Sequence, residues 1–298
     1  MLITGAGGFV CSHLAQGFLA MGDAVTGLDL SFDAATRERL TGANLVEQAL
    51  TAQSLASLGS FDLVIHGAAL TTVPLNLDST GYVELNVGLL RDCLHFAIAS
   101  GASDFVFLSS SGVFSPEDGD GVHLETTIPT ATAPYAIAKR MGEEAAVAAN
   151  STTLRAVAVR LGPVYGPAET SRGSRIVVSQ IRRWLDAAVS GNPITIEKPN
   201  EIRDWTFAPD LPFALDALLG IRPKLTGTVH LTAASRVSNR DLAAAIADIT
   251  GGACVEQQGD SNAARLPMAS SRLDLDELFA WTPLAAGLAQ TFSEEVLR

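Results

Sequence analysis

Tyr135 and Lys139 stand four residues apart, a spacing that places two side chains on the same face of a helix. A free phenol has a pKa of about 10 and is a poor base at neutral pH. A neighbouring ammonium group favours the phenolate and lowers that pKa toward the working range. The pair therefore points to proton transfer to or from an alcohol or carbonyl oxygen.

Three consecutive serines, Ser109 to Ser111, follow the apolar run 105–108. Ligands of parallel α/β sheets bind outside the carboxyl ends of the strands, and these serines end such a strand. A hydroxyl group there is able to hold a substrate oxygen beside Tyr135. The serines thus predict a Ser-Tyr-Lys centre, and the alternative is that they only cap a loop.

Gly5 and Gly8 follow an expected strand at 1–4 and precede an expected helix at 9–21. Glycines in such a turn let the backbone approach a pyrophosphate, whose charge then lies at the helix N-terminus. The third glycine of the pattern, which lets the helix pack closely on the strand, is replaced by Cys11. Because a thiol is small, we expect the helix to form with a slight shift.

Asp29 ends the next expected strand. A carboxylate at this place accepts hydrogen bonds from both ribose hydroxyls of NAD and repels the additional phosphate of NADP. No arginine follows Asp29 directly, which also favours NAD. The positive nicotinamide would further favour the Tyr135 phenolate, and Lys139 would hydrogen-bond the nicotinamide ribose. The alternative for Asp29 is a solvated loop residue.

Apolar runs alternate with helical patterns over the first part of the chain, which predicts a parallel sheet covered on both faces. The expected strands are 1–4, 24–30, 63–66, 105–108 and 155–161, and the expected helices are 9–21, 80–100 and 135–150. The predicted fold class is therefore α/β, a Rossmann-type doubly wound parallel sheet with a smaller, interleaved C-terminal substrate domain.

The alternation ends near residue 163. We expect a helix at 176–189, a strand at 227–232 that rejoins the main sheet, and a helix at 239–250 capped by Ser238 or Asn239, followed by a tail of short elements. The predicted domains are an NAD-binding Rossmann domain, 1–163 with roughly 200–232, and a substrate-binding domain, 164–199 with 233–298.

Composition excludes several classes of protein. A net charge of −12 argues against a nucleic-acid partner, which needs a basic face. No apolar run approaches the ~20 residues of a membrane span, and we expect no membrane partner. The three cysteines form neither a disulfide framework nor a CxxC metal pattern, so we expect three buried thiols, no metal site and a cytoplasmic location.

The sequence resembles the extended short-chain dehydrogenases/reductases of the NAD-dependent epimerase/dehydratase family over essentially its whole length. The motifs that carry the resemblance are Thr4–Val10, His66–Ala69, Asn86, Ser109–Phe114, Glu125, Tyr135 with Lys139, Arg160–Pro167, Arg203–Trp205 and Asp210. The resemblance implies NAD as the cofactor and a small carbohydrate-type molecule as the substrate. It also implies a homodimer, since helices 80–100 and 135–150 resemble the family's four-helix interface.

The resemblance also implies roles for single residues. Ser110 is the expected catalytic hydroxyl, with Tyr135 and Lys139, and Asn86 is expected to brace the cofactor-side helix. Besides Asp29, Tyr135 and Lys139, the expected cofactor contacts are Gly5, Gly8, Phe9, Val10, Ala68, Ala69, Asn86, Pro163 and Val164.

Three departures from the family's pattern bear on the reaction. Dehydratases carry an Asp-Glu pair directly after the catalytic hydroxyl, where this chain has Ser111-Gly112, so sugar dehydration is not expected. Many nucleotide-sugar epimerases have asparagine where this chain has Pro163, which weakens a nucleotide-sugar assignment. The acid that contacts adenine is replaced around Gln48-Ala49, so adenine recognition is expected to differ.

Three arginines are candidates for binding an anionic substrate, because a guanidinium group pairs with a carboxylate or phosphate through two hydrogen bonds. Arg172 and Arg175 lie in an expected loop, and Arg203 lies in an Arg-Asp-Trp motif. Solvated loop residues are the alternative for the first two, and an ion pair with Asp204 or Asp210 for the third. Thr71 and Ser111 are the remaining substrate-side candidates. We expect His66 to be a packing residue.

These observations predict an NAD-dependent oxidoreductase that transfers hydride to or from a secondary hydroxyl of a sugar, sugar acid or related polyol. A nucleotide-sugar 4-epimerase with retained NAD is the first alternative, since it uses the same centre. A non-catalytic NAD sensor is the remote alternative, because both Tyr135 and Lys139 are present.

Overall fold

The computed structural model describes residues 1–173, 176–221, 225–233, 236–256 and 265–296. A seven-stranded sheet forms its centre, in the order β11-β6-β5-β4-β1-β2-β3. The strands are β1 (Leu2–Thr4), β2 (Thr26–Asp29), β3 (Asn44–Glu47), β4 (Leu63–His66), β5 (Asp104–Ser110), β6 (Arg155–Leu161) and β11 (Gly227–Leu231). Neighbouring strands from β3 to β6 are parallel. The predicted fold class, a Rossmann-type parallel sheet with flanking helices, is confirmed.

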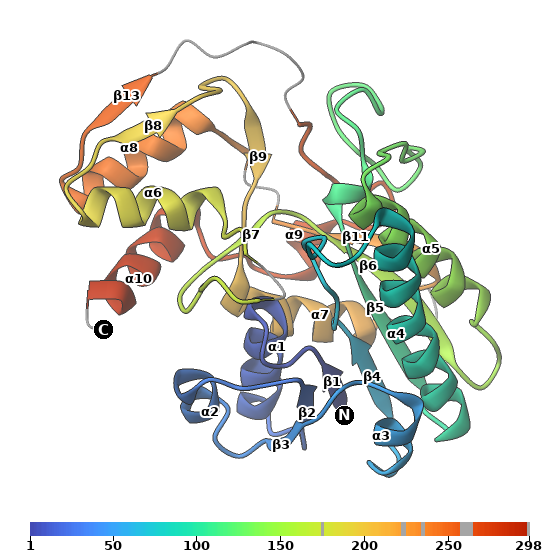
Figure 1. The fold of residues 1–298 in the computed structure, drawn as a ribbon. Coiled ribbons are helices and arrows are strands. Elements are labelled where there is room, and N and C mark those ends of the chain that lie inside the picture. The colour runs from blue at the N-terminus through green and yellow to red at the C-terminus, as the bar shows by residue number, and fades with distance from the viewer. Residues whose placement is uncertain (174–175, 222–224, 234–235, 257–264, 297–298) are drawn as a thin grey trace. The chain divides into compact units, whose positions relative to one another are not determined.

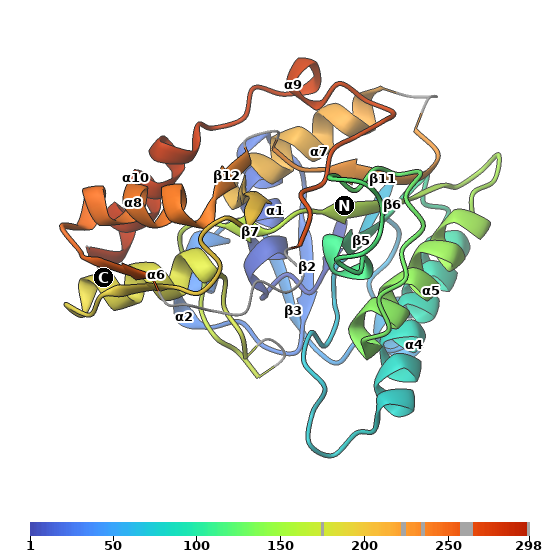
Figure 2. The same ribbon diagram turned by 90° about the horizontal axis from the view of Figure 1, so that it is seen from above.

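Helices cover both faces of this sheet (Figures 1 and 2). One face carries α4 (Ser79–Ala99) and α5 (Pro134–Ala148), with α3 (Ala52–Ala56) against α4, and the other carries α1 (Phe9–Ala20) and α7 (Leu211–Gly220). The short α2 (Ala34–Arg39) follows β2. Glycines allow the closest approaches: a Cβ on Gly17 of α1 would lie 2.1 Å from Pro212 of α7, and one on Gly142 of α5 would lie 2.5 Å from the Phe107 ring. The first glycine thus lets α1 and α7 pack closely on each other, and the second lets α5 pack closely on β5.

Contacts divide the chain into two compact units. The first unit consists of 1–113, 131–161 and 211–229, and contains β1 to β6 and the first three residues of β11, with α1 to α5 and α7. The second consists of 114–130, 162–210 and 230–298. Residues 114–130 and 200–210 belong to the second unit, whereas the sequence placed them in the NAD-binding domain. The reason for 114–130 is a set of hydrogen bonds, since Glu125 accepts from Ser270 and Ser271.

The second unit is built from short strands and three longer helices. Its elements are β7 (Val164–Tyr165), α6 (Gln180–Val189), β8 (Ile194–Ile196), β9 (Ile202–Asp204), β10 (Thr206–Phe207), η2 (Ala208–Asp210), β12 (Arg236–Ser238), α8 (Asn239–Thr250), β13 (Cys254–Glu256), α9 (Leu275–Leu278) and α10 (Leu284–Val296). The strands form three pairs: β7 pairs with β10, β9 with β12, and β8 with β13. Its core joins apolar residues of α6 and α8 to Tyr165, Trp205 and Leu288.

Several sequence-based boundaries differ from the structure. The helix expected at 176–189 begins at Gln180, because Ser179 caps it by accepting from Arg182 N. Ser238 is the cap of α8, one of the two candidates. The tail holds a 13-residue helix, α10, which we did not predict. Cys11 and Cys93 are buried, but Cys254 is exposed on β13, so the expectation of three buried thiols was wrong.

No helix in the described part of the chain is both long enough and apolar enough to cross a membrane.

Candidate active site

Ser110 and Tyr135 lie next to one another in the first unit. Ser110 is the last residue of β5, and Tyr135 follows Pro134 in the first turn of α5, where proline's fixed φ favours helix initiation. A Cβ built on Gly112 would lie 3.1 Å from Tyr135 Cε1 and 3.3 Å from Ser110 Oγ. The glycine, which lies in the 3-10 turn η1 (Ser111–Val113), thus leaves the space between the two hydroxyl-bearing side chains free of a side chain.

Lys139 lies one turn further along α5 and is buried. Its Nζ donates to Leu108 O at 2.7 Å, and lies 4.7 Å from the centroid of the Phe107 ring and 5.8 Å from that of Tyr135. Burial lowers the pKa of Lys139 to about 8, while Cys11 and Glu143 act in the opposite direction. The amine is therefore close to its tyrosine, held by a backbone carbonyl and an aromatic face.

A pocket in the first unit opens beside this pair. Its lining consists of His66, Ala68, Ala69, Leu70, Asn86, Leu90, Phe107, Tyr135, Ala138 and Lys139. Asn86 shapes the wall, since its Oδ1 accepts from Leu70 N at 2.9 Å and its Nδ2 donates to Tyr82 O at 3.1 Å. Five sequence-predicted residues thus meet at one place: Ala68, Ala69, Asn86, Tyr135 and Lys139.

His66 is a buried side chain whose Nδ1 lies 2.8 Å from Thr4 Oγ1, and its ring stacks on Phe107 with 6.0 Å between centroids. Burial, followed by the charge of Lys139, lowers the pKa of His66 to about 3. The imidazole is therefore neutral and stacked on a neighbouring ring, as a packing residue would be.

The turn between β1 and α1 fits the pyrophosphate of a dinucleotide. Gly5 has φ +77°, and a Cβ there would come 2.8 Å from Ala68 N. α1 begins at Phe9 directly after Gly8, and in this described segment no side chain caps it and its first turn carries no acid. Its first N–H groups, including those of Phe9 and Val10, are thus oriented toward an incoming anion.

Asp29 lies at the mouth of the same turn. Its Oδ2 accepts from Gly7 N at 2.9 Å and its Oδ1 from Leu30 N at 2.7 Å. Each carboxylate oxygen has a second acceptor position, so the group fits two ribose hydroxyls. The residues present therefore fit NAD.

Cys11 is accommodated by its neighbour across the turn. A Cβ on Gly67 would lie 2.2 Å from the Cys11 sulfur, so the thiol fills a volume that glycine leaves open. Burial raises the pKa of the Cys11 thiol to about 12, with the Asp29 charge adding to the effect. The cysteine is a packed thiol, and α1 starts at Phe9 as expected.

The edge of the sheet near Asp29 holds contacts that sequence reasoning missed. The Glu47 carboxylate accepts from Phe32 N at 2.9 Å and pairs with Arg37, whose guanidinium lies 5.7 Å from the Phe32 ring centroid. Gln48, where the family's acid is replaced, donates its N–H to Asp29 O at 3.0 Å.

The predicted substrate residues, and two of the predicted cofactor contacts, Pro163 and Val164, are divided between the two units. Thr71 lies in the loop after β4 and Ser111 begins η1, both in the first unit. Pro163 precedes β7, Val164 begins it, and Arg172 and Arg203 also lie in the second unit, while Arg175 lies outside the described residues. Arg203 Nε donates to the buried Glu201 at 2.5 Å. In the described part of the chain, its ion-pair partner is thus Glu201 and neither Asp204 nor Asp210, although the charge of Arg203 opposes the rise in the pKa of the buried Asp204.

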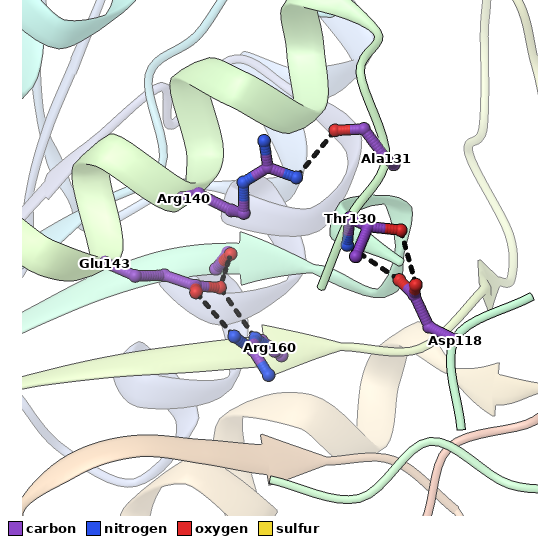
Figure 3. A network of polar contacts seen from close by, with 7 residues as sticks. Asp118, Thr130, Ala131, Arg140, Glu143 and Arg160 are labelled. Carbon is purple, nitrogen blue, oxygen red and sulfur yellow. Dashed lines mark hydrogen bonds and ion pairs between the residues drawn. The ribbon is translucent and has the colours of Figure 1, made fainter. Parts of the chain in front are cut away.

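A buried network beside the catalytic pair was also missed. The Arg160 guanidinium pairs with the Glu143 carboxylate through two hydrogen bonds of 2.7 Å (Figure 3). Ser109 Oγ donates to the same carboxylate. Glu143 is four residues beyond Lys139, which is a sequence signal for a shared helix face. The position of its partner Arg160 depends on the register of β5 with β6, so no local sequence pattern indicates that the two residues pair.

A model of the NAD-dependent epimerase/dehydratase family matches residues 1–225. The chain belongs to this family. Membership confirms the predicted resemblance, the assignment as an NAD-dependent enzyme and NAD as the cofactor.

Relatives of this family member were found by sequence and by structure. The uncharacterized UDP-glucose epimerase YtcB of Bacillus subtilis (strain 168) is 29% identical, over 84% of this chain and 82% of the relative. UDP-glucuronate 4-epimerase 1 of Arabidopsis thaliana is 31% identical, over 76% of this chain and 56% of the relative. The structure of UDP-glucose 4-epimerase with UDP-glucose from Thermotoga maritima has a TM-score of 0.82 at 23% identity, and covers 100% of this chain and 99% of that one.

Proposed function

We propose that this enzyme transfers hydride between NAD and a secondary hydroxyl of a sugar nucleotide, with Ser110, Tyr135 and Lys139 as its catalytic residues. The observation that carries the proposal is that all three side chains lie at the carboxyl ends of the strands, beside a turn that fits a pyrophosphate. When bound, NAD supplies the hydride acceptor at C4 of its nicotinamide.

Each side chain has one task in this mechanism. Ser110 Oγ hydrogen-bonds the reacting oxygen and orients it. Tyr135 Oη takes the hydroxyl proton during oxidation and returns a proton to the carbonyl oxygen during reduction. The Lys139 ammonium stabilises the phenolate form of Tyr135 from the same helix face, and leaves Leu108 O to reach the nicotinamide ribose. The wall of Ala68 and Ala69 would limit access of water to the cofactor.

Support for a sugar nucleotide comes from the relatives, whose names are those of UDP-glucose and UDP-glucuronate epimerases. Arg172, Arg175 and Arg203 remain the proposed ligands of the diphosphate or of a sugar carboxylate, with Thr71 and Ser111 near the sugar. Arg203 already pairs with Glu201, so its guanidinium group would have to bind the substrate anion and Glu201 at the same time.

The relatives favour 4-epimerisation, in which the sugar would be oxidised and then reduced from the other face while the cofactor stays bound and returns to its oxidised form. A net dehydrogenase is the second candidate, because Pro163 replaces the asparagine that many epimerases of the family carry. The Asp29 carboxylate supports NAD in both cases.

The test is incubation of the purified enzyme with UDP-glucose or UDP-glucuronate, with and without added NAD. An epimerase converts many equivalents of sugar nucleotide without added NAD and accumulates no NADH, which is the result we expect. A dehydrogenase stops when its bound NAD is reduced and resumes when NAD is added. The proposal is contradicted if neither sugar nucleotide is converted under either condition.

The expected homodimer belongs to the same proposal. Apolar side chains of α4 and α5 are exposed in the single chain, namely Leu85, Ile98, Met141 and Val147. A four-helix interface built from two copies of α4 and α5 would cover such residues. Light scattering should give twice the chain mass, and a Leu85→Glu/Met141→Glu variant should give the single mass. The cytoplasmic location stays a prediction.

A further inference from the structure

We propose that Ser109, Glu143 and Arg160 form a positioning network that holds the end of β5 and the Lys139 turn of α5 in the arrangement that catalysis requires. The inference rests on the Ser-Tyr-Lys function proposed above. None of the three side chains is proposed to touch substrate or cofactor, so each acts through its neighbour.

The geometry of the network is that of a tight, buried ion pair. Arg160 Nε and Nη2 each donate at 2.7 Å, one to each carboxylate oxygen of Glu143. Ser109 Oγ adds a third hydrogen bond of 2.5 Å to Oε1. The Arg160 and Glu143 side chains are only 6% and 7% exposed, so solvent screens their charges little.

The network connects the elements that carry the catalytic groups. Glu143 projects from α5 one turn after Lys139 and two turns after Tyr135, on the same helix face. Ser109 directly precedes Ser110 in β5, and it is paired in register with Arg160 of β6. One carboxylate therefore ties the helix of Tyr135 to the last residues of the strand of Ser110.

Stability alone is a weak reason for burying this pair. Desolvation of two charges offsets most of their attraction, and apolar side chains of similar volume often stabilise a core equally well. What apolar side chains lack is the fixed direction of three hydrogen bonds, which sets helix and strand positions to within a fraction of an ångström. Placement of Ser110 and Lys139 to that accuracy matters for hydride and proton transfer.

The network should also affect the pKa of Lys139, because Glu143 is one of the charged groups near its amine. Cys11 faces the amine from α1, His66 from β4, and Tyr135 and Glu143 from α5 itself. Burial lowers the pKa of Lys139, and Glu143 is the carboxylate that opposes this. Removal of Glu143 should therefore lower the pKa of Lys139 further, which is measurable in the enzyme without substrate.

A matched control lies on the same two strands. Arg155 of β6 pairs with Asp104 of β5, also in register, at the opposite end of both strands from Ser110. Like the network, it contains an arginine–carboxylate pair, but this pair joins β6 to β5, whereas Arg160–Glu143 joins β6 to α5. Asp104 also lies six residues from Ser110, roughly 20 Å at about 3.3 Å per residue. A general loss of stability from removing an ion pair of β6 would be common to both variants, whereas an effect on the placement of α5 belongs to the Glu143 pair.

The experiment replaces the whole network with apolar groups, as Ser109→Ala/Glu143→Leu/Arg160→Met, so that none of the three side chains is left buried without the other two. The control variant is Asp104→Leu/Arg155→Met. For each folded variant, circular dichroism reports the fold, fluorescence titration the NAD affinity, and sugar-nucleotide turnover kcat and KM. Chemical labelling of Lys139, followed by peptide mass spectrometry over a pH series, reports the pKa of Lys139 without any need for turnover.

The network variant should keep its fold and bind NAD within about threefold, yet lose at least about tenfold in kcat with little change in KM. Its Lys139 should become reactive at lower pH, while the control variant matches the wild type in both measurements. The proposal is overturned by a kcat within twofold of wild type with unchanged Lys139 labelling, or by equal losses in the two variants.

A second variant keeps the test decisive if the triple variant does not fold. Glu143→Gln retains an acceptor for Ser109 and removes the charge, so it should reproduce the shift in Lys139 labelling and part of the loss in kcat. Labelling unchanged from wild type would overturn the proposal. If the wild-type enzyme itself converts no sugar nucleotide, the proposed function fails, and the labelling result still decides whether the network acts on Lys139.

Discussion

Cys11 and Gly67 occupy one small volume between α1 and the end of β4. The third glycine of a dinucleotide-binding turn normally allows the helix to pack on the strand, and here the space for a thiol is provided by a second glycine instead. The departure at position 11 was visible in the sequence. Its compensation at position 67 was not, because the two residues are 56 positions apart and meet only through the order of β1 and β4 in the sheet.

This pairing predicts the outcome of a double-mutant cycle. Gly67→Ala should destabilise the enzyme by about 1–3 kcal/mol through overpacking against the sulfur, and should weaken NAD binding because α1 is displaced. Cys11→Gly/Gly67→Ala should recover most of both losses. Urea unfolding and NAD titration measure the two effects, and a Gly67→Ala variant as stable as wild type would exclude the contact.

The buried His66 should cause part of the loss of folding stability at low pH. Burial disfavours the cation and lowers the pKa of His66 to about 3 in the folded chain, from its ordinary value of 6.5. A lowered pKa means that the unfolded chain binds the proton first, so the stability from His66 is complete above pH 6.5 and is lost as the pH falls toward 3.

The expected loss between pH 6.5 and pH 5 is about 2 kcal/mol, at about 1.4 kcal/mol per pKa unit. Urea unfolding at the two pH values measures it in the wild type and in His66→Gln, which does not titrate. The variant should lose correspondingly less stability than the wild type. An equal loss in both proteins would show that other groups cause the acid sensitivity.

At the scale of the elements, α5 carries most of the proposed chemistry. The sequence predicted this helix and the shared face of Tyr135 and Lys139, because helical periodicity is a local property. It did not predict the partner of Glu143 or the close contact at Gly142, since both depend on the strands that pack beneath the helix. Local patterns thus give a helix and the face on which residues lie, while neighbouring elements determine what that face contacts.

A substitution at Gly142 tests how closely α5 must pack on the sheet. An alanine Cβ there would lie 2.5 Å from the Phe107 ring, which also contacts Lys139, so Gly142→Ala should destabilise by about 1–3 kcal/mol and lower kcat. Gly220→Ala is the matched control, because no atom of the described residues lies within 4 Å of its Cβ and alanine suits a helix better by about 0.5–1 kcal/mol. Thermal unfolding should separate the two. Equal stability of the two variants would contradict the close approach.

At the scale of the whole molecule, the sequence predicted the sheet better than the second unit. β1, β4 and β6 are mostly apolar, which is the pattern of strands buried on both faces, and their positions agree with the structure within one residue. β8, β9, β12 and β13 have three residues each and pair over long sequence distances, so they carry little periodicity. α10 was missed because prolines nearby suggested short elements.

The division into units has the same explanation. Residues 114–130 follow β5 in the chain, and sequence proximity placed them with the Rossmann sheet. Asp118 instead accepts from Ser115 N and Thr130 N, which closes the segment on itself, and Glu125 binds the segment around Ser270. Hydrogen bonds between distant parts of the chain set these boundaries, and no local composition signals them.

Replacement of Tyr135 by phenylalanine tests the central claim most directly, because it removes one hydroxyl group and leaves the ring. Tyr135→Phe should retain NAD affinity within about threefold and lose at least about a hundredfold in sugar-nucleotide turnover, the usual contribution of general acid–base catalysis. Turnover of that variant at the wild-type rate, with NAD bound, would contradict the account.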